Sequence, residues 1–329
     1  QVKVSKGTSH VRLLNGSVWN MSSFSFSNDK SIPIEVLVED SAFTLKGDLF
    51  LRGSGSCRLT FKGEKSKLNL GGAMRTMEDR LTVGATVFLD GGIHSWGYSP
   101  YNGDNGSCSL SGTDVVISNK AVLTATSTLS IRNASSLTVC DGASLTTPGS
   151  TGIGHMAWKR PSFFGDSSLV VDAGTVTVGS LTFGDVETYS NNCLRVVGPL
   201  SRVETATGGM AFNYGAKVAF EIPAEGYHDA DGVARAPVYT AKAFSSTTTK
   251  NCRPIGLELA TRTFDRANPK KSVTLLQAAS DSRTVFGQLM ANVTWTDNPH
   301  RHGTLSVSED GKSLVYTAAA KQGLAVIIR

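Results

Sequence analysis

This chain of 329 residues lacks the long apolar runs and paired cysteine motifs that mark several large classes of protein. No window reaches the 18 or more apolar residues that a bilayer requires, and no basic-then-apolar leader opens the chain, which predicts no transmembrane segment. The five cysteines, at positions 57, 108, 140, 193 and 252, form no CxxC pair, so they predict neither a zinc site nor a thioredoxin-like centre. We expect most of them to be small buried residues.

Charge and catalytic motifs are scarce as well. Only 18% of the residues are charged, and the net charge of +5 is spread along the chain, which predicts no nucleic-acid partner. No Gly-x-Ser-x-Gly elbow, nucleotide-binding glycine loop or catalytic cysteine-histidine signature occurs. The residues Asp90, Asp114, Asp141, Asp172 and Asp185 mostly stand at or beside expected turns, where Asp stabilises the backbone locally. The sequence therefore supports no catalytic residues and no enzyme.

A short apolar triplet recurs along the chain. Triplets with apolar ends begin at residues 36, 59, 81, 115, 137, 169, 194 and 218, and the steps between them are 23, 22, 34, 22, 32, 25 and 24 residues. Each of the two long steps contains a glycine- and aromatic-rich segment, residues 91–109 or residues 148–166, which we interpret as a loop insertion in one repeat. Because Thr and Ser alternate with the apolar residues, the triplets predict half-buried strands.

One repeat cannot bury its own apolar face, whereas stacked repeats can. The sequence therefore predicts an all-β fold, a right-handed parallel β-helix (solenoid) with coils of about 22 residues over residues 1–220. A two-sheet sandwich is the alternative, since regularly spaced short strands also mark that class. Residues 221–329 differ in character, and we interpret them as a transition segment followed by a β-rich cap over the end of the stack.

The phrase from Ser136 to Thr146, with its relatives at Leu169–Val178 and Gly179–Gly184, resembles the repeats of bacterial autotransporter passenger domains and related β-helix surface proteins. The stretch from Val273 to Thr317 is similar to the C-terminal part of such domains. This resemblance implies an exported protein that acts in adhesion, scaffolding or, less often, carbohydrate cleavage. The chain departs from a true autotransporter because it ends at Arg329 without a translocator barrel.

Three segments contain candidate binding residues. An aromatic loop and a basic insertion are predicted to form a shared lip for a surface glycan, through Trp96, Tyr98, Tyr101, His155, Trp158, Lys159 and Arg160. In a second segment, Asp229 and Asp231 have the Asp-x-Asp-Gly spacing of a calcium loop, but the distal Glu is missing, so we expect no cofactor and keep calcium as the alternative. His300 and His302 alternate without a nearby third metal ligand, which favours a surface loop.

The two ends of the chain carry apolar strands that predict self-association. The N-terminal segments 11–14 and 18–21 have few charges that would block an edge, and the last strand presents Leu324, Val326 and Ile328. The chain opens at Gln1, so either a leader has been removed or the chain has been trimmed. Since it is rich in strands, Ser and Thr, we expect an exported protein, located outside the cell or on its surface. The predicted function is a self-associating structural subunit of a filament, sheath or coat. An adhesin or carbohydrate-binding module is the alternative, followed by a polysaccharide lyase or hydrolase.

Overall fold

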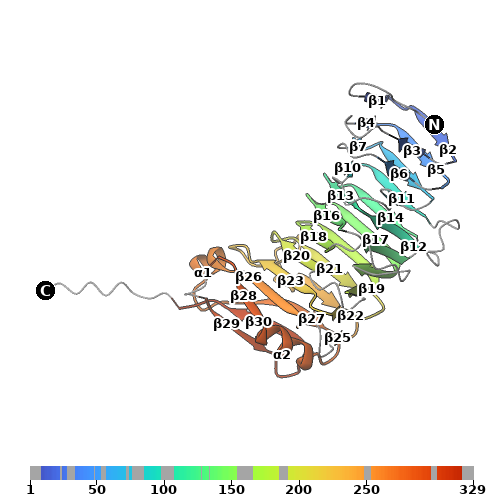
Figure 1. The fold of residues 1–329 in the computed structure, drawn as a ribbon. Coiled ribbons are helices and arrows are strands. Elements are labelled where there is room, and N and C mark those ends of the chain that lie inside the picture. The colour runs from blue at the N-terminus through green and yellow to red at the C-terminus, as the bar shows by residue number, and fades with distance from the viewer. Residues whose placement is uncertain are drawn as a thin grey trace.

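The computed structural model describes residues 9–22, 24–27, 34–47, 49–52, 57–71, 74–75, 85–97, 107–126, 128–132, 134–153, 166–184, 192–247, 253–297 and 302–320. These residues form an all-β protein of long, mostly parallel sheets, in which strands stack from β1 at one end to a cap at the other (Figure 1). Among them, no helix is both long and apolar enough to cross a membrane.

The first ladder is a continuous sheet of 11 parallel strands. The strands are, in spatial order, β1 (Ser9–Leu14), β4 (Ile34–Glu39), β7 (Cys57–Lys62), β10 (Ala85–Asp90), β13 (Thr113–Ser118), β16 (Ser136–Cys140), β18 (Ser168–Asp172), β20 (Cys193–Val197), β23 (Lys217–Glu221), β26 (Gly256–Ala260) and β28 (Val293–Trp295). We call the chain from one of these strands to the next a rung. Each rung adds further short strands before the chain returns to the first ladder.

The other parallel strands form two further ladders. The second ladder contains β2 (Val18–Met21), β5 (Ala42–Leu45), β8 (Lys67–Leu70), β11 (Ile93–Trp96), β14 (Val122–Ala125), the first parts of β17 (Ser144–Ile153) and β19 (Thr175–Phe183), β21 (Arg202–Thr205), β24 (Val238–Thr240) and β27 (Ser272–Ala278). The third ladder contains β3 (Phe24–Ser27), β6 (Leu49–Arg52), β9 (Met74–Arg75), β12 (Ser107–Ser111), β15 (Thr128–Arg132), the last parts of β17 and β19, β22 (Met210–Asn213) and β25 (Phe244–Thr247). Because β17 and β19 run through both, the two ladders form one sheet.

The core consists of inward columns of aliphatic and aromatic side chains. In the first ladder Val115, Leu137 and Leu169 pair in register and are at most 1% exposed. In the third ladder Phe183 and Phe212 stack at 5.4 Å between ring centroids. Alternation therefore places one face of each strand in a shared core, as the apolar triplets predict.

The register differs from the predicted repeat in the fourth rung. The triplet that begins at Leu81 lies outside the described residues, and the strand between β7 and β13 is β10, where Val87 pairs with both Leu59 and Val115. Separations along the first ladder range from 22 residues between Val115 and Leu137 to 39 residues between Val218 and Leu257.

Described strands extend beyond two of the predicted boundaries. The parallel ladder does not end at residue 220, because β26 and β28 extend it. The segments taken as insertions contain strands of the ladders, since β11 and β12 lie within or across 91–109 and β17 continues to Ile153. Among the described strands, these segments therefore contribute to the stack itself.

Left-handed turns join the first ladder to the second. Asp141 and Gly142 have φ angles of 52° and 73°, and Gly91 and Gly92 have 82° and 84°. A Cβ atom at Gly92 would lie 2.1 Å from the carbonyl oxygen of Ser66, so this position needs glycine for space as well as for its dihedral angle. These turn residues let the chain change direction while the rungs stay closely stacked.

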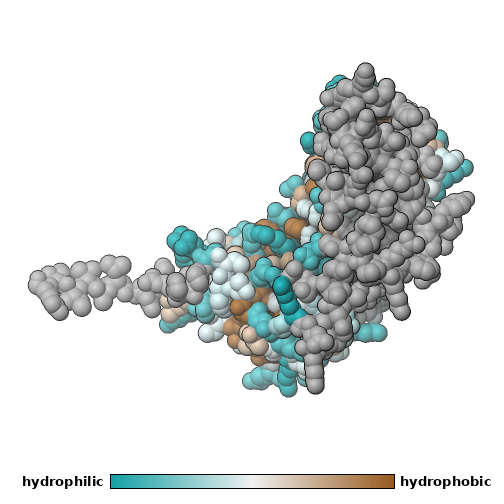
Figure 2. All heavy atoms as spheres, in the orientation of Figure 1, coloured by the Kyte–Doolittle hydropathy of each residue, from teal (hydrophilic) through white to brown (hydrophobic). Residues whose placement is uncertain are grey.

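A mixed cap closes two of the three ladders at the C-terminal end. β27 pairs in parallel with β24 and antiparallel with β30 (Ser313–Thr317), which pairs antiparallel with β29 (Thr304–Val307). Helix α2 (Arg283–Ala291) buries Phe286 against Phe244 of the third ladder at 5.5 Å between ring centroids, and α1 (Arg262–Ala267) buries Phe264. Figure 2 shows hydrophobic residues among hydrophilic ones around β29 and β30, where Leu305 and Val307 are partly buried. The sequence interpretation did not include the two helices.

Candidate functional site

Most residues of the predicted ligand-binding lip lie outside the described part of the chain. They are Tyr98, Tyr101, His155, Trp158, Lys159 and Arg160, so their role stays a prediction. Trp96 is different, because its side chain is 1% exposed. It belongs to β11 and packs in the core, so its assignment to an exposed lip is wrong. The physical reason is that β11 continues the second ladder, where alternate side chains must point inward.

The same strand buries His94, which is 1% exposed. Its Nδ1 accepts a hydrogen bond from the Leu68 amide at 2.9 Å, and its Nε2 donates to the Gly91 carbonyl at 2.8 Å. Burial lowers the pKa of His94, and the hydrogen bond to Gly91 opposes that shift. The neutral imidazole is thus buried in the core with both ring nitrogens hydrogen-bonded. The alternation in Ile93-His94-Ser95-Trp96 was the sequence signal that could have revealed it.

The predicted calcium residues lie in an exposed turn. Asp229 Oδ1 accepts the amides of Val233 at 2.9 Å and Asp231 at 3.0 Å, and these bonds, that of Val233 most of all, lower the pKa of the Asp229 carboxyl. Within the described ranges, no three His, Cys, Asp or Glu residues come together in a way that could hold a metal ion. Asp229 therefore stabilises its own turn. Calcium binding at Asp229 and Asp231 stays an alternative, and the described residues add no third ligand to these two.

The cysteines at positions 57, 140 and 193 are free thiols. Cys57 and Cys108 are buried as expected, whereas Cys140 and Cys193 are half-buried, and Cys252 lies outside the described residues. Burial raises the pKa of Cys57 to about 12 and the pKa values of Cys140 and Cys193 to about 11. These three thiols stay protonated near neutral pH, so they are poor nucleophiles.

The acidic residues act on the backbone and on neighbouring rungs. Asp141 occupies a left-handed turn position, and Asp114 Oδ1 accepts the amide of Ser136 at 3.1 Å and its hydroxyl at 2.6 Å. Burial, followed by the nearby charge of Asp141, raises the pKa of Asp172. Asp185 lies outside the described residues. The contacts of Asp114 thus tie its carboxylate to the next rung, and Asp141 supplies a left-handed turn position.

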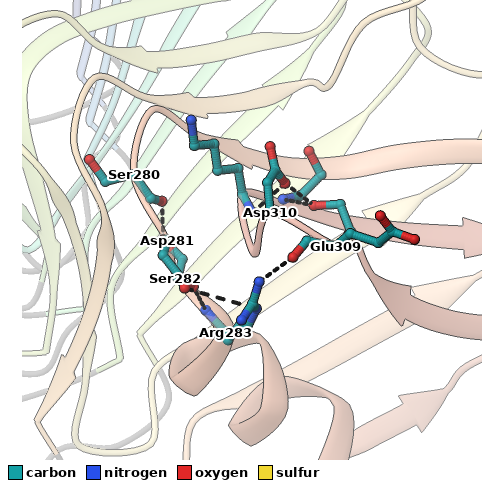
Figure 3. Close-up of polar contacts among 9 residues, drawn as sticks. Ser280, Asp281, Ser282, Arg283, Glu309 and Asp310 are labelled. Carbon is teal, nitrogen blue, oxygen red and sulfur yellow. Dashed lines mark hydrogen bonds and ion pairs between the residues drawn. The ribbon is translucent and has the colours of Figure 1, made fainter.

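A network of polar contacts fastens the C-terminal hairpin to α2 (Figure 3). Arg283 donates from its guanidinium to the Glu309 carbonyl, and its amide donates to Asp281 Oδ1 at 2.9 Å. At the hairpin tip, Asp310 Oδ1 accepts the Ser308 hydroxyl at 2.6 Å. The contacts join the start of the helix to the turn between β29 and β30, so the cluster has a structural role.

An aromatic cluster lies beside the last strand of the first ladder. His302 stacks on Trp295 with 3.8 Å between ring centroids and 1° between ring planes, while the partner residue of the predicted pair, His300, lies outside the described residues. Tyr316 donates its hydroxyl to Asp265 Oδ1 at 2.6 Å and accepts the Gly303 amide at 2.8 Å. Burial raises the pKa of Tyr316 to about 12. The cluster joins α1 to the capping hairpin.

The surface best suited to a function is the N-terminal end of the stack. In the described part of the chain, β1, β2 and β3 each have a strand partner on one side alone, and we call these three strands the open first rung. Val11, Trp19 and Met21 lie partly buried against the core, and Val18 is 62% exposed. The open first rung therefore combines an unpaired backbone edge with an apolar interior.

Comparison with protein-family models, curated proteins and solved structures finds no match to this chain. The resemblance to autotransporter passenger domains consequently stays a prediction from the sequence. The described fold supports an all-β stack of long parallel sheets, open at its N-terminal end and largely closed at its C-terminal end.

Proposed function

We propose that this chain is an exported structural protein, a right-handed parallel β-helix whose copies join end to end through the open first rung into a filament, sheath or coat. The observation that carries the proposal is that β1, β2 and β3, at one end of a long stack, have no partner on their outer side among the described residues. Unpaired backbone donors and acceptors recruit further strands unless the protein covers them. The right hand of the helix follows the general preference of parallel crossover connections.

The two ends of the first ladder suit a head-to-tail contact. At one end the inward residues Val11 and Leu13 form an apolar face, while the charged Arg12 points outward and is exposed. At the other end β28 pairs with β26, and the described chain adds no strand beyond it in this ladder. A contact between two different surfaces does not close on itself unless its rotation forms a ring, so it favours a filament.

A matched pair of lysine substitutions tests this proposal. Val11→Lys places an ammonium group in the end face, whereas Val18→Lys places the same group on the same rung at a side chain that is already 62% exposed. Sedimentation velocity and electron microscopy of the full chain over a concentration series should show end-to-end particles for the wild type and Val18→Lys. Val11→Lys should weaken assembly at least tenfold, with an unchanged circular dichroism spectrum. Wild-type protein that stays monomeric at the highest soluble concentration would refute the proposal.

Export and surface location are separate parts of the proposal. They rest on the strand-rich, Ser- and Thr-rich composition of a chain with 18% charged residues. Protease treatment of intact cells that express the protein should degrade it, while a cytoplasmic marker stays intact. Protection of the chain in intact cells and its absence from the medium would contradict this location.

A further inference from the structure

The outward face of the first ladder contains an uncharged stripe along its centre. Six consecutive strands, from β4 to β18, place one outward residue in the same column. We call this column the lateral stripe: Leu37, Thr60, Phe88, Val116, Thr138 and Val170. All six side chains are half-buried, and the column continues into Arg12 at one end and Arg195 at the other.

The core does not explain this stripe. Residues on either side of it in each strand, such as Val87 and Leu89 around Phe88, point inward and are at most 1% exposed. The neighbouring outward columns are largely polar and contain Glu35, Arg58, Thr86, Asp114, Ser136 and Ser168 on one side and Glu39, Lys62, Asp90, Ser118, Cys140 and Asp172 on the other. The stripe thus contains four apolar residues and two threonines between charged and polar columns, and an exposed apolar surface with a polar rim marks an interaction surface.

One contact shows that the stripe is accessible at the surface. The Arg58 guanidinium lies over the Phe88 ring, 4.5 Å from its centroid. Arg58 is exposed and reaches Phe88 from the neighbouring outward column. The ring thus faces outward from the sheet, and the group above it is the exposed Arg58 side chain, which must move aside when a partner packs on the ring.

We propose that two copies of this chain pair laterally, with their lateral stripes face to face and their rungs running in opposite directions. The order of the side chains is compatible with a twofold axis between β10 and β13. That axis places Phe88 opposite Val116 of the second copy, Thr60 opposite Thr138 and Leu37 opposite Val170. Each pair then occurs twice, as a twofold interface requires.

The size of the face fits such a pair. Six strands spaced about 4.8 Å apart cover about 29 Å, and five residues of each strand cover about 17 Å, so the flat footprint is about 490 Å² per copy. Two copies bury about 1,000 Å², which is the lower limit for a specific interface. Outward side chains of two sheets packed about 10 Å apart interdigitate, so Phe88 and Leu37 have room in the contact. We expect a weak, reversible dimer.

This pairing goes beyond the proposed end-to-end assembly and is separable from it. A twofold contact closes at two copies, whereas a head-to-tail contact continues. The lateral stripe lies on the side of the stack, and the open first rung lies at its end. Val11→Lys therefore acts on filaments alone, and a substitution in the stripe acts on lateral pairs alone.

Charge substitution in the full chain tests the pairing and its register. Sedimentation equilibrium in the Val11→Lys background should detect a dimer, which Val116→Lys weakens at least tenfold. The control Thr124→Lys, on the exposed outer face of the second ladder, should leave the dimer unchanged. Combining Phe88→Glu with Val116→Lys should restore dimerisation, because the axis brings these two positions together. Circular dichroism confirms that each variant is folded.

Three results would overturn the pairing. They are a Val11→Lys protein that stays monomeric throughout, a Val116→Lys variant that dimerises as tightly as its parent, and a charge pair that fails to restore the dimer. If the wild type forms filaments and any of these three results is obtained, the lateral pairing is refuted and end-to-end assembly is still supported. A lateral dimer without filaments would support the pairing and refute end-to-end assembly.

Discussion

Acidification should destabilise the stack through His94, which is buried in β11. Its Nδ1 accepts the Leu68 amide, so a proton on that nitrogen would place two donors face to face. Burial lowers the pKa of His94 from 6.5 in the folded protein, while the unfolded chain keeps the ordinary value. Below pH 6.5 the unfolded state therefore takes up a proton that the folded state does not, and stability falls with pH.

The size of this effect follows from proton linkage. One proton bound only by the unfolded state changes the free energy of unfolding by at most about 1.4 kcal/mol per pH unit. Between pH 6.5 and pH 4.5 the contribution of His94 reaches at most about 2.7 kcal/mol. The loss ends once the pH falls below the folded pKa, because both states then bind the proton.

A neutral replacement isolates this contribution from that of the carboxyl groups. His94→Gln can still accept from Leu68 and donate to Gly91, but it does not titrate. Urea unfolding followed by circular dichroism at pH 7.5, 6.5, 5.5 and 4.5 should show a smaller loss of stability for His94→Gln than for the wild type. The control is His10→Gln, which makes the same replacement at an exposed histidine of β1. Equal pH dependence of His94→Gln and the wild type would refute the reasoning.

Three further changes test other parts of the fold. Tyr316→Phe removes the buried hydroxyl that donates to Asp265, and it should lower the free energy of unfolding by about 1–3 kcal/mol, measured by urea denaturation. Gly92→Ala should lower the melting temperature more than Gly232→Ala does. Both glycines have positive φ, but a Cβ at Gly92 would lie 2.1 Å from a carbonyl oxygen, whereas a Cβ at Gly232 would have open space around it. Equal losses of melting temperature would contradict this packing argument. Deletion of 324–329 should abolish any polymer and leave the circular dichroism spectrum unchanged, and a truncated protein that assembles like the full chain would exclude a role for that segment.

Alternation along the chain predicted much of the core. The triplets at Val36, Leu59, Val115 and Leu137 lie in strands of the first ladder, with their apolar ends buried. This inference succeeded because the side chains of a strand alternate with a period of two, which is a local property that any stretch of sequence displays. The apolar strands after residue 272 likewise predicted closure at the C-terminal end, and β27 and β30 provide it.

Residues far apart in the sequence decided the rest. By alternation alone, a strand of the first ladder could contain either Leu81 or Val87. The strand contains Val87, because this residue pairs with Leu59 and Val115, each 28 residues away in the sequence.

His94 lies in the segment 91–109, which the sequence analysis interpreted as a loop insertion. Only the fold brings the Leu68 amide, from a strand 26 residues earlier, to its ring nitrogen. Composition, alternation and turn residues by themselves determined that the chain forms short stacked strands. The tertiary structure decided which strands are neighbours, because a strand's partners and a polar group's hydrogen bonds come from other rungs.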